Sequence, residues 1–260
     1  TDWYTAVSNC SSLTLGGGGW RLPNIVELTS VLSSGSQIVE LPFTWNDALW
    51  LQFWTNTTLS ADPNYAFKKS VGLGAFHGSW WQSVDSRDAR GIKTDTFGLN
   101  RAVCIRGDTL ARNLVDSPKQ FVDNGDGTVI DLDTGLIWEK VGLAASSPET
   151  RWNNSVVHCN NQNTGGFNDW RLPTISEGVT LIDYSCPNET PSHCTDRYRN
   201  SAFDWLGGAD DYYWTGTTWS SNPGTAYVLD LDGGRVPNPD EVLSVDKPID
   251  FAVRCVRDLS

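Results

Sequence analysis

The sequence predicts an α+β protein made of two tandem copies of one unit, each with two helices and a small antiparallel sheet closed by a disulfide. Three observations lead to this prediction. Sequence blocks recur in the same order, the cysteines follow the recurrence, and each copy passes from helical periodicity to short strands. Copy one covers residues 1–107 and copy two residues 118–260, with a linker at 108–117.

The repeat consists of four blocks. They pair Trp3, Val7 and Cys10 with Trp152, Val156 and Cys159, residues 20–23 with 170–173, residues 53–58 with 213–218, and residues 102–106 with 252–257, the last with one inserted residue. The copies differ in length between the blocks. We expect these extra stretches to be surface loops, because insertions between repeats map to loops.

The cysteines follow the repeat. Six cysteines allow 15 pairings, but Cys10–Cys104 and Cys159–Cys255 have nearly equal separations of 94 and 96 residues. We therefore expect one long-range bridge in each copy and a local bridge between Cys186 and Cys194. A metal site is the less favoured alternative, because there is no C-x-x-C and the three histidines lack ligand spacing. Disulfides indicate an oxidising compartment outside the cytosol.

Two helices are predicted in each copy. Residues 3–10 and 152–159 place Trp, Val and Cys on one helical face. A second helix should follow each Trp-Arg-Leu-Pro block, with Pro23 and Pro173 in its first turn and Glu27 and Glu177 near its positive end. Apolar stripes support both second helices: Ile25, Leu28 and Leu32 in copy one, and Ile175, Val179 and Ile182 in copy two.

Short strands and turns account for the remaining pattern. Residues 128–131 and 135–139 should form a hairpin around Asp133-Thr134. Residues 226–230 lead into a turn at Asp232-Gly233-Gly234. Residues 252–256 form a closing strand, which Cys255 would tie back to the first helix of copy two.

Composition excludes several classes of function. Lys and Arg number 19 and Asp and Glu 31, for a net charge of −12, which argues against nucleic acid and anionic membrane surfaces as partners. No apolar run reaches the roughly 18 residues that span a bilayer, so we expect no membrane insertion. The sequence has no Met and begins with Thr1. We expect an exported extracellular or cell-surface protein whose signal or pro-segment has been removed.

The blocks resemble the Lcl C-terminal domain family, named for the end domain of a collagen-like bacterial surface adhesin. The resemblance rests on residues 121–131, 134–138, Trp152, Cys159, 166–173, 213–215 and 253–257. It covers nearly all of 118–260, and 1–107 without the opening segment. It implies a C-type-lectin-like fold, a bacterial surface or secreted location, often adhesion, and no defined catalytic residues. It also implies a first helix bridged to the last strand.

One property implied by the resemblance does not carry over. The family's adhesin member is associated with sulfated polysaccharides through a basic surface. This chain is strongly acidic, so long-range repulsion would oppose a sulfated ligand.

Acidic residues crowd one hairpin and form a candidate calcium site, because hard cations bind carboxylate oxygens. The candidate ligands are Asp123, Asp126 and Asp131, with Asp133 beside them. The alternative is turn chemistry, which we favour because Asp, Asn and Gly are common at tight turns without a metal. Calcium is the only cofactor that the sequence suggests.

The thirteen tryptophans divide into two groups. We expect Trp20, Trp54, Trp138, Trp170 and Trp214, which lie in the repeat blocks, to belong to the core or framework. Exposed aromatic rings stack on sugars and other apolar ligands, so the ligand candidates lie outside or beside the blocks: Trp80, Trp81, Trp219, Trp45 and Trp50. For each of these, packing over the core is the favoured alternative.

The leading hypothesis is a non-catalytic, extracellular, adhesin-like binding module for a glycan or surface protein. No nucleophile elbow, zinc-protease or phosphate-loop motif is present, so we expect no enzymatic activity. The alternative is a structural subunit of a bacterial surface filament or pilus-like polymer. An extracellular enzyme on a lectin-like scaffold is a distant third.

The polymer alternative arises from a difference between the copies. Copy two opens with a hairpin at 121–138, whereas copy one starts at its first helix. In a lectin-like fold the opening and closing strands lie together, so the strand at 101–106 should lack its neighbour. An unpaired edge recruits another strand, from a removed upstream segment, a separate polypeptide or the next subunit of a homo-polymer. The alternative is that a loop or the linker at 108–117 covers this edge.

Overall fold

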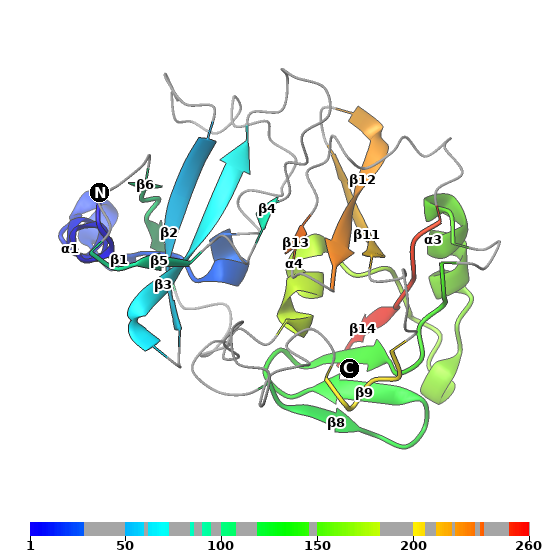
Figure 1. The fold of residues 1–260 in the computed structure, drawn as a ribbon. Helices are drawn as coiled ribbons and strands as arrows, with labels where there is room; N and C mark the ends of the chain where they lie inside the picture. The colour runs from blue at the N-terminus through cyan, green and yellow to red at the C-terminus, as the bar shows by residue number, and fades with distance from the viewer. Residues whose placement is uncertain are drawn as a thin grey trace.

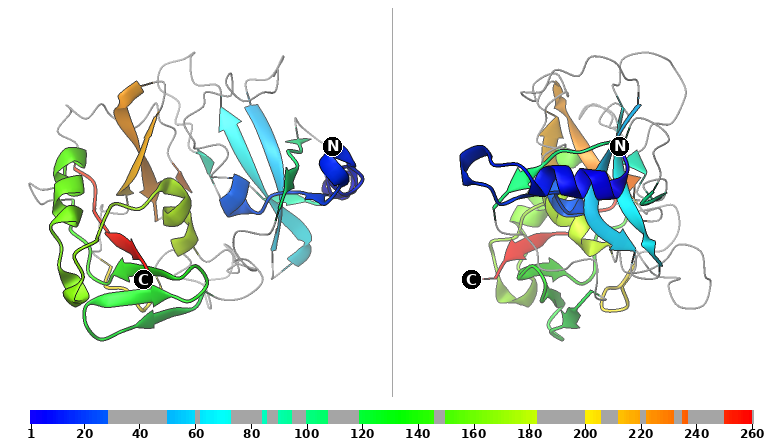
Figure 2. Two further views of the ribbon diagram at one scale, coloured as in Figure 1. Left: turned by 180° about the vertical axis from the view of Figure 1, so that it is seen from behind. Right: turned by 90° about the vertical axis from the view of Figure 1, so that its left-hand side faces the viewer.

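The computed structural model of the chain is described here for residues 1–28, 50–59, 62–72, 84–85, 90–94, 100–107, 119–145, 150–182, 200–205, 212–219, 222–231, 235–236 and 250–259. Residues 1–107 are called the N-terminal half and residues 119–259 the C-terminal half. The two halves lie side by side (Figure 1), as the view from behind also shows, and in the view turned by 90° the N-terminal half lies in front (Figure 2).

The N-terminal half begins with helix α1 (Trp3–Ser11), a 3₁₀ turn at Leu15–Gly17 and strand β1 (Trp20–Arg21). Asp2 caps α1 by accepting a hydrogen bond from the Thr5 amide. A second helix begins at Ile25 and is described as far as Leu28. The strands that follow are β2 (Trp50–Leu59), β3 (Asp62–Gly72), β4 (Val84–Asp85), β5 (Arg90–Ile92), β6 (Asn100–Arg101) and β7 (Ile105–Arg106).

The C-terminal half opens with strands β8 (Phe121–Asp123), β9 (Thr128–Asp131) and β10 (Leu136–Glu139). Helix α3 (Trp152–Asn160), a 3₁₀ turn at Thr164–Gly166, helix α4 (Ile175–Gly178) and a 3₁₀ turn at Val179–Leu181 follow. The chain then forms β11 (Tyr212–Trp219), β12 (Asn222–Asp230), β13 (Arg235–Val236) and β14 (Val256–Asp258). The α+β class is therefore confirmed.

Five sheets connect these strands. Their strand orders are β5-β3-β2-β6, β1-β7, β14-β10-β9-β8, β11-β12 and β13-β4. The last sheet joins the halves, with Arg235 opposite Asp85 and Val236 opposite Val84. One core cluster also contains residues of both halves, including Ile25 and Phe67 together with Trp138 and Ile175. The halves therefore share apolar packing as well as a strand pair.

Two predicted features of the helices are corrected by the structure. Pro23 and Pro173 lie before the helices and not in their first turns. Thr174 is the N-cap of α4, and it forms a capping box with Glu177. The predicted apolar stripe is buried at Ile175, Val179 and Ile182, but the α-helix ends at Gly178 and residues 179–181 continue as a 3₁₀ turn.

The same ion pair fixes the Trp-Arg-Leu-Pro block in both halves. Arg21 donates two hydrogen bonds to the Glu27 carboxylate at 2.8 and 2.7 Å, and Arg171 donates two to Glu177 at the same distances. Bidentate guanidinium–carboxylate pairs fix orientation as well as charge. Each glutamate also accepts the amide of the N-cap residue. The pair therefore ties the block to the helix that follows it.

The Trp-Thr block is also held in the same way twice. The indole of Trp54 donates to the Thr1 carbonyl at 2.9 Å and that of Trp214 to the Thr150 carbonyl at 2.6 Å. Strands β2 and β3 pair with shifts in register between Trp54 and Thr58, and β11 and β12 shift between Trp214 and Thr218. The block thus directs an equivalent irregular hairpin in each half.

Buried hydroxyl groups complete these hairpins. The Thr215 hydroxyl donates to the Tyr227 carbonyl at 2.8 Å and accepts the Thr217 amide at 3.3 Å. Thr55 makes the same two bonds, to the Phe67 carbonyl and from the Thr57 amide. Both threonines are fully buried, so these bonds satisfy backbone groups that water cannot reach.

The closing segment of the C-terminal half differs from the predicted strand at 252–256. Ala252 and Val253 form isolated bridges to Tyr213 and Leu143, and the regular strand β14 runs from Val256 to Asp258. The interruption contains Arg254, which is buried and bonds to carbonyl groups outside the ladder. A side chain that competes for backbone acceptors explains why the regular strand begins late.

Strand pairing also corrects the alignment of the closing segments. Phe53 pairs with Arg101 as Tyr213 pairs with Ala252. Arg21 pairs with Ile105 as Arg171 pairs with Val256. Residues 101–106 therefore correspond to 252–257 one for one, without the predicted inserted residue. Val103 therefore occupies the position of Arg254. The Ala-Val pair at 102–103 and at 252–253 suggests a different alignment from sequence alone.

We predict that Thr215→Val lowers the free energy of unfolding by about 1–3 kcal/mol, because the substitution conserves shape but leaves buried backbone groups without a partner. Thr218→Val, on the same strand but exposed, is the matched control and should change stability little. Urea unfolding of both variants makes the measurement. Equal stability of the two variants would contradict a structural role for the buried hydroxyl.

Candidate functional site

The hairpin of β8 and β9 holds the carboxylates predicted as calcium ligands. One oxygen of Asp123 accepts the Gly125 amide at 2.9 Å, and the other pairs with the Lys140 ammonium at 2.8 Å. The hydrogen bond and charge of Lys140 lower the pKa of Asp123. Asp126 accepts both the amide and the hydroxyl of Thr128. Both carboxylates therefore form turn and ion-pair contacts typical of a loop.

Asp131 lies apart from this loop end. Its side chain is fully buried, and its carboxylate is 3.9 Å from the Lys119 ammonium, which is also 3.9 Å from Asp133. Burial raises the pKa of Asp131, and the Lys119 charge opposes that rise. A lysine thus supplies the positive charge next to this carboxylate. Among the described residues, the three predicted ligands do not come within metal-binding distance of one another.

We predict that neither calcium nor a chelator will change the melting temperature of the intact chain. The hairpin carboxylates already have ammonium or hydroxyl partners, and a cation would have to displace them. Thermal unfolding with calcium, with magnesium and with chelator makes the comparison. A calcium-specific rise in melting temperature that disappears in Asp126→Asn would restore the calcium site.

The predicted ligand-binding tryptophans are only partly within the described residues. Trp50 begins β2 and Trp219 ends β11, while Trp45, Trp80 and Trp81 lie outside the described residues. The framework tryptophans behave as expected, since Trp54, Trp138, Trp170 and Trp214 are buried. Trp20 is the exception, because it is only partly buried, and its indole donates to the Leu15 carbonyl.

Both long-range disulfides are present as predicted. Cys10 is bonded to Cys104 and Cys159 to Cys255. Each bridge joins the first helix of its half to the closing segment. Cys186 and Cys194 lie outside the described residues, so their bridge stays a prediction.

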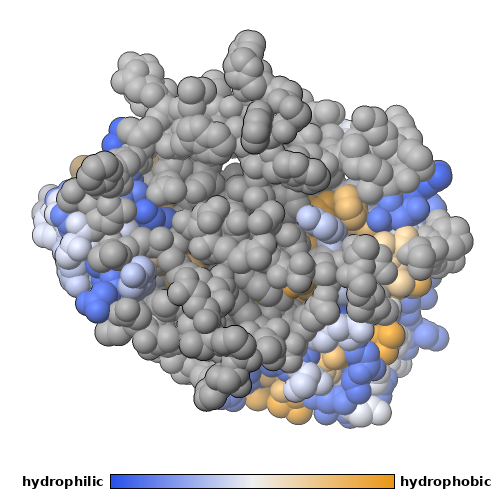
Figure 3. Space-filling view, in the orientation of Figure 1, coloured by the Kyte–Doolittle hydropathy of each residue, from blue (hydrophilic) through white to orange (hydrophobic). Residues whose placement is uncertain are grey.

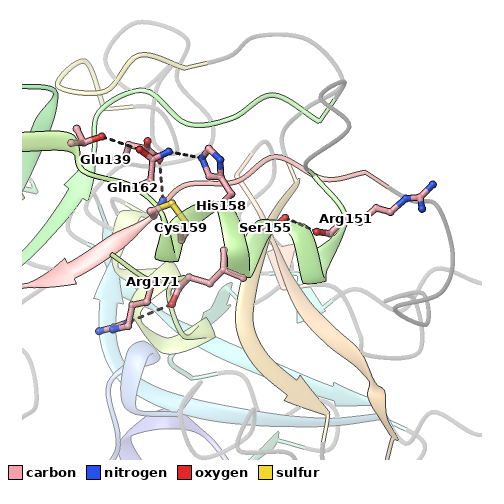
Figure 4. The surroundings of a disulfide bond; sticks show 10 residues. Glu139, Arg151, Ser155, His158, Cys159, Gln162 and Arg171 are labelled. Carbon is pink, nitrogen blue, oxygen red and sulfur yellow. Dashed lines mark hydrogen bonds between the residues drawn. A yellow bond between two sulfur atoms is a disulfide. The ribbon is translucent and has the colours of Figure 1, made fainter. Parts of the chain in front are cut away.

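A group of polar side chains surrounds the Cys159–Cys255 bridge (Figure 4). Glu139, His158 and Cys255 offer ligand-type atoms within 4.8 Å of one another. Cys255 is oxidised in the disulfide, so it offers no thiolate for a metal ion. His158 lies 2.8 Å from the Gln162 amide nitrogen, and the figure shows the two side chains turned toward each other. The group is a polar environment around a disulfide and lacks the thiolate ligand of a metal centre.

Glu139 provides the carboxyl group of this cluster. Burial raises its pKa from 4.5 to about 7, against the opposing effects of the Cys255 amide and the Arg254 charge. Its carboxylate accepts the Cys255 amide at a long 3.4 Å. The folded environment therefore favours the protonated, uncharged form of the Glu139 carboxyl group.

Because the folded pKa lies above the unfolded value, Glu139 makes the protein less stable as pH rises from about 4.5 to about 7. We predict that Glu139→Gln removes this effect and raises the free energy of unfolding above pH 7 by up to roughly 3 kcal/mol. The gain should vanish near pH 4. Denaturant unfolding across this pH range makes the measurement.

Glu177→Gln provides a control with the opposite sign. The Arg171 and Thr174 hydrogen bonds lower the pKa of Glu177 against the effect of burial, so its loss should destabilise the protein at neutral pH. A Glu139→Gln variant that is as unstable as Glu177→Gln at pH 8 would contradict the assignment of Glu139.

A shallow hollow of about 440 Å³ lies on the outer face of α3 and is lined by Asn154, Val157, His158, Asn161 and Gln162. Val157 is 57% exposed. Three amides and an imidazole around an apolar side chain can hydrogen-bond neutral polar ligands while covering an apolar face. Sequence patterns do not reveal this surface, because its residues lie on α3 and in the turn that follows it without any motif spacing.

Apolar side chains also reach the surface on the hairpin of the C-terminal half. Val122 on β8 is 45% exposed and Leu132, after β9, is 55% exposed. The space-filling view shows apolar atoms among hydrophilic ones over this region (Figure 3). Scattered exposed apolar residues are normal, so they indicate no ligand by themselves.

Comparison with known families identifies the C-terminal half of the chain. The family model of the Lcl C-terminal domain matches residues 127–257. The chain belongs to the Lcl C-terminal domain family. The match begins within the loop before β9 and ends in β14, so it includes the bridged helix α3 and the closing segment. Neither the curated proteins nor the solved structures contain a match to the chain.

The family and the disulfides are consistent with an extracellular surface protein. Within the described residues, no helix is both long enough and apolar enough to span a bilayer.

Proposed function

We propose that the chain is an extracellular, non-catalytic, adhesin-like binding module made of two tandem Lcl C-terminal domains with C-type-lectin-like folds. Its ligand is a glycan or a protein on another surface. The observation that carries the proposal is the combination of a bridged framework of this family with a neutral amide-lined hollow on α3. Such a hollow suits hydroxyl-rich, uncharged ligands better than sulfated ones.

The tandem-domain part of the proposal is supported by contacts that recur in both halves. The bidentate Arg–Glu pair, the Trp–carbonyl bond, the buried Thr hydroxyl and the helix-to-strand disulfide occur in both. Four independent interactions at corresponding sequence positions favour duplication of one unit over chance similarity. The N-terminal domain would then cover residues 1–107 and the C-terminal domain residues 118–260.

The non-catalytic part of the proposal is supported by the structural role of the charged side chains, which form ion pairs within the fold. In the described part of the chain, Arg21, Arg171 and Arg257 pair with carboxylates inside the framework. The cluster with the most perturbed carboxyl group surrounds an oxidised cysteine. These groups hold the fold together, and an active site would need them free to reach a substrate.

The proposal predicts that the hollow on α3 contacts the ligand. A glycan array with the intact chain would identify an uncharged glycan. Asn161→Ala should then weaken its binding by about three- to tenfold, as expected for one hydrogen bond. Asn160→Ala is the matched control, because Asn160 is an exposed neighbour that does not line the hollow. Equal affinities of the two variants would remove α3 from the site.

The tryptophans proposed from the sequence offer the other location for a ligand. If Trp80→Ala and Trp81→Ala abolish binding while Asn161→Ala does not, the ligand lies on the N-terminal half, and the amide hollow is a surface feature only.

A second candidate function, a subunit of a surface polymer, is favoured by one observation. The closing segment of the N-terminal half has an unpaired outer edge in the described part of the chain.

A further inference from the structure

The outer edge of the closing segment is paired in the C-terminal half. Strand β14 lies between Arg171 and β10, with Ile137 opposite Arg257 and Trp138 opposite Val256. The pairing continues upstream, where Val253 and Leu143 exchange two backbone hydrogen bonds at 2.9 and 2.8 Å. Residues 136–143 thus form the outer neighbour of the closing segment.

The N-terminal half has the inner neighbour of this segment but not the outer one. Strand β7 pairs with β1, as Val256 does with Arg171. In the described part of the chain, no strand lies on the other side of β7. The backbone groups of Ala102, Val103 and Cys104 make no hydrogen bond to any described residue.

Burial shows the same difference between the two segments. Val253, Arg254, Cys255 and Val256 are each 1% exposed or less. Their counterparts Ala102, Val103, Cys104 and Ile105 are all only partly buried. The residues are mainly apolar in both segments, so the N-terminal segment has the composition of a central strand and the exposure of an edge strand. An edge of this kind is a template for another strand.

We propose that the outer edge of residues 102–106 accepts an antiparallel β-strand from another polypeptide chain, whose chemistry resembles that of residues 136–143. Ala102, Cys104 and Arg106 correspond to the residues of the C-terminal half that bond outward, Val253, Cys255 and Arg257. These three residues present the groups that the incoming strand pairs with. Main-chain bonds then provide affinity, and alternate side chains provide specificity.

The surroundings define the incoming strand further. The position of Trp138 is filled in the C-terminal half by a fully buried indole, so a large apolar side chain suits that place. Val103 occupies the position of Arg254. Because valine cannot donate hydrogen bonds to carbonyl groups as Arg254 does, it would contact the incoming strand by apolar packing. Arg101 and Arg106 are exposed at the two ends of the segment. A strand with a central aromatic residue and no positive charge at its ends is compatible with these two arginines.

The experiment uses the intact chain and a synthetic peptide with the sequence of residues 134–143, followed by residue-resolved amide hydrogen exchange. Without peptide, the amides of Ala102, Cys104 and Arg106 should exchange rapidly, while those of Val253 and Arg257 in the same molecule stay protected. With peptide, exchange at the three N-terminal positions should slow by about tenfold or more, and the C-terminal positions should not change.

Two backbone-methylated peptides test the geometry without altering the protein. The Glu139 amide donates to the Cys255 carbonyl, so methylation at that position should abolish protection of the N-terminal edge. Trp138 is its neighbour, and its amide points to the other side of the strand, so methylation there is the matched control and should leave the edge pairing intact. Loss of protection with both peptides, or with neither, would contradict strand addition.

Protection of Ala102, Cys104 and Arg106 in the isolated monomer would overturn the proposal, because another part of the chain would then pair with the edge. A peptide that leaves all three amides unprotected would also overturn it. Glycan binding measured in the same samples is a separate result, since a strand site can be present without the α3 site and the reverse.

Discussion

The closing segment of the C-terminal half, residues 252–258, is the constraint on which the rest of that half depends. It joins β11 through Ala252, helix α3 through the Cys159–Cys255 bridge and the Trp-Arg-Leu-Pro block through Val256. The opening hairpin pairs with its outer edge. Segments that are distant in sequence therefore meet on one short strand. A long-range disulfide at this point removes entropy mainly from the unfolded chain, so it stabilises all of these contacts together.

Arg254 shows how that segment includes a buried charge. Its guanidinium donates to the carbonyls of Glu139 and Lys140 at 2.6 Å and of Asp204 at 3.1 Å, and lies over the rings of Phe203 and Trp205. Burial lowers its pKa, and carbonyl dipoles with aromatic faces offset the cost of removing the charge from water. The side chain thereby fastens the end of β10 to the closing segment. In the N-terminal half Val103 occupies the corresponding position, and the described residues there include no strand equivalent to β10.

Much of the framework was predictable because tryptophan, cysteine and the Arg–Glu pair recur at fixed spacing, and each makes a contact that few other residues can make. The two long-range disulfides and both first helices follow from that pattern, whereas strands β9 and β10 follow from the turn between them at Asp133-Thr134. The alignment of the closing segments was not predictable, since Ala-Val occurs in both blocks one position apart and only strand pairing fixes the register. The partners of the hairpin carboxylates, Lys119 and Lys140, are likewise brought in by folding, so the sequence showed an acidic cluster without its counter-charges.

The strongly acidic composition and the neutral hollow on α3 lead to one view of recognition. The arginines of the framework are paired inside the fold, so they contribute little positive potential at the surface. A ligand approaching this protein meets net negative charge, which disfavours sulfated or carboxylated polymers at long range. At short range it meets amides, which pair equally well with donors and acceptors. Under the proposed binding function, long-range repulsion of anions combined with neutral amides at the surface favours uncharged, hydroxyl-rich ligands.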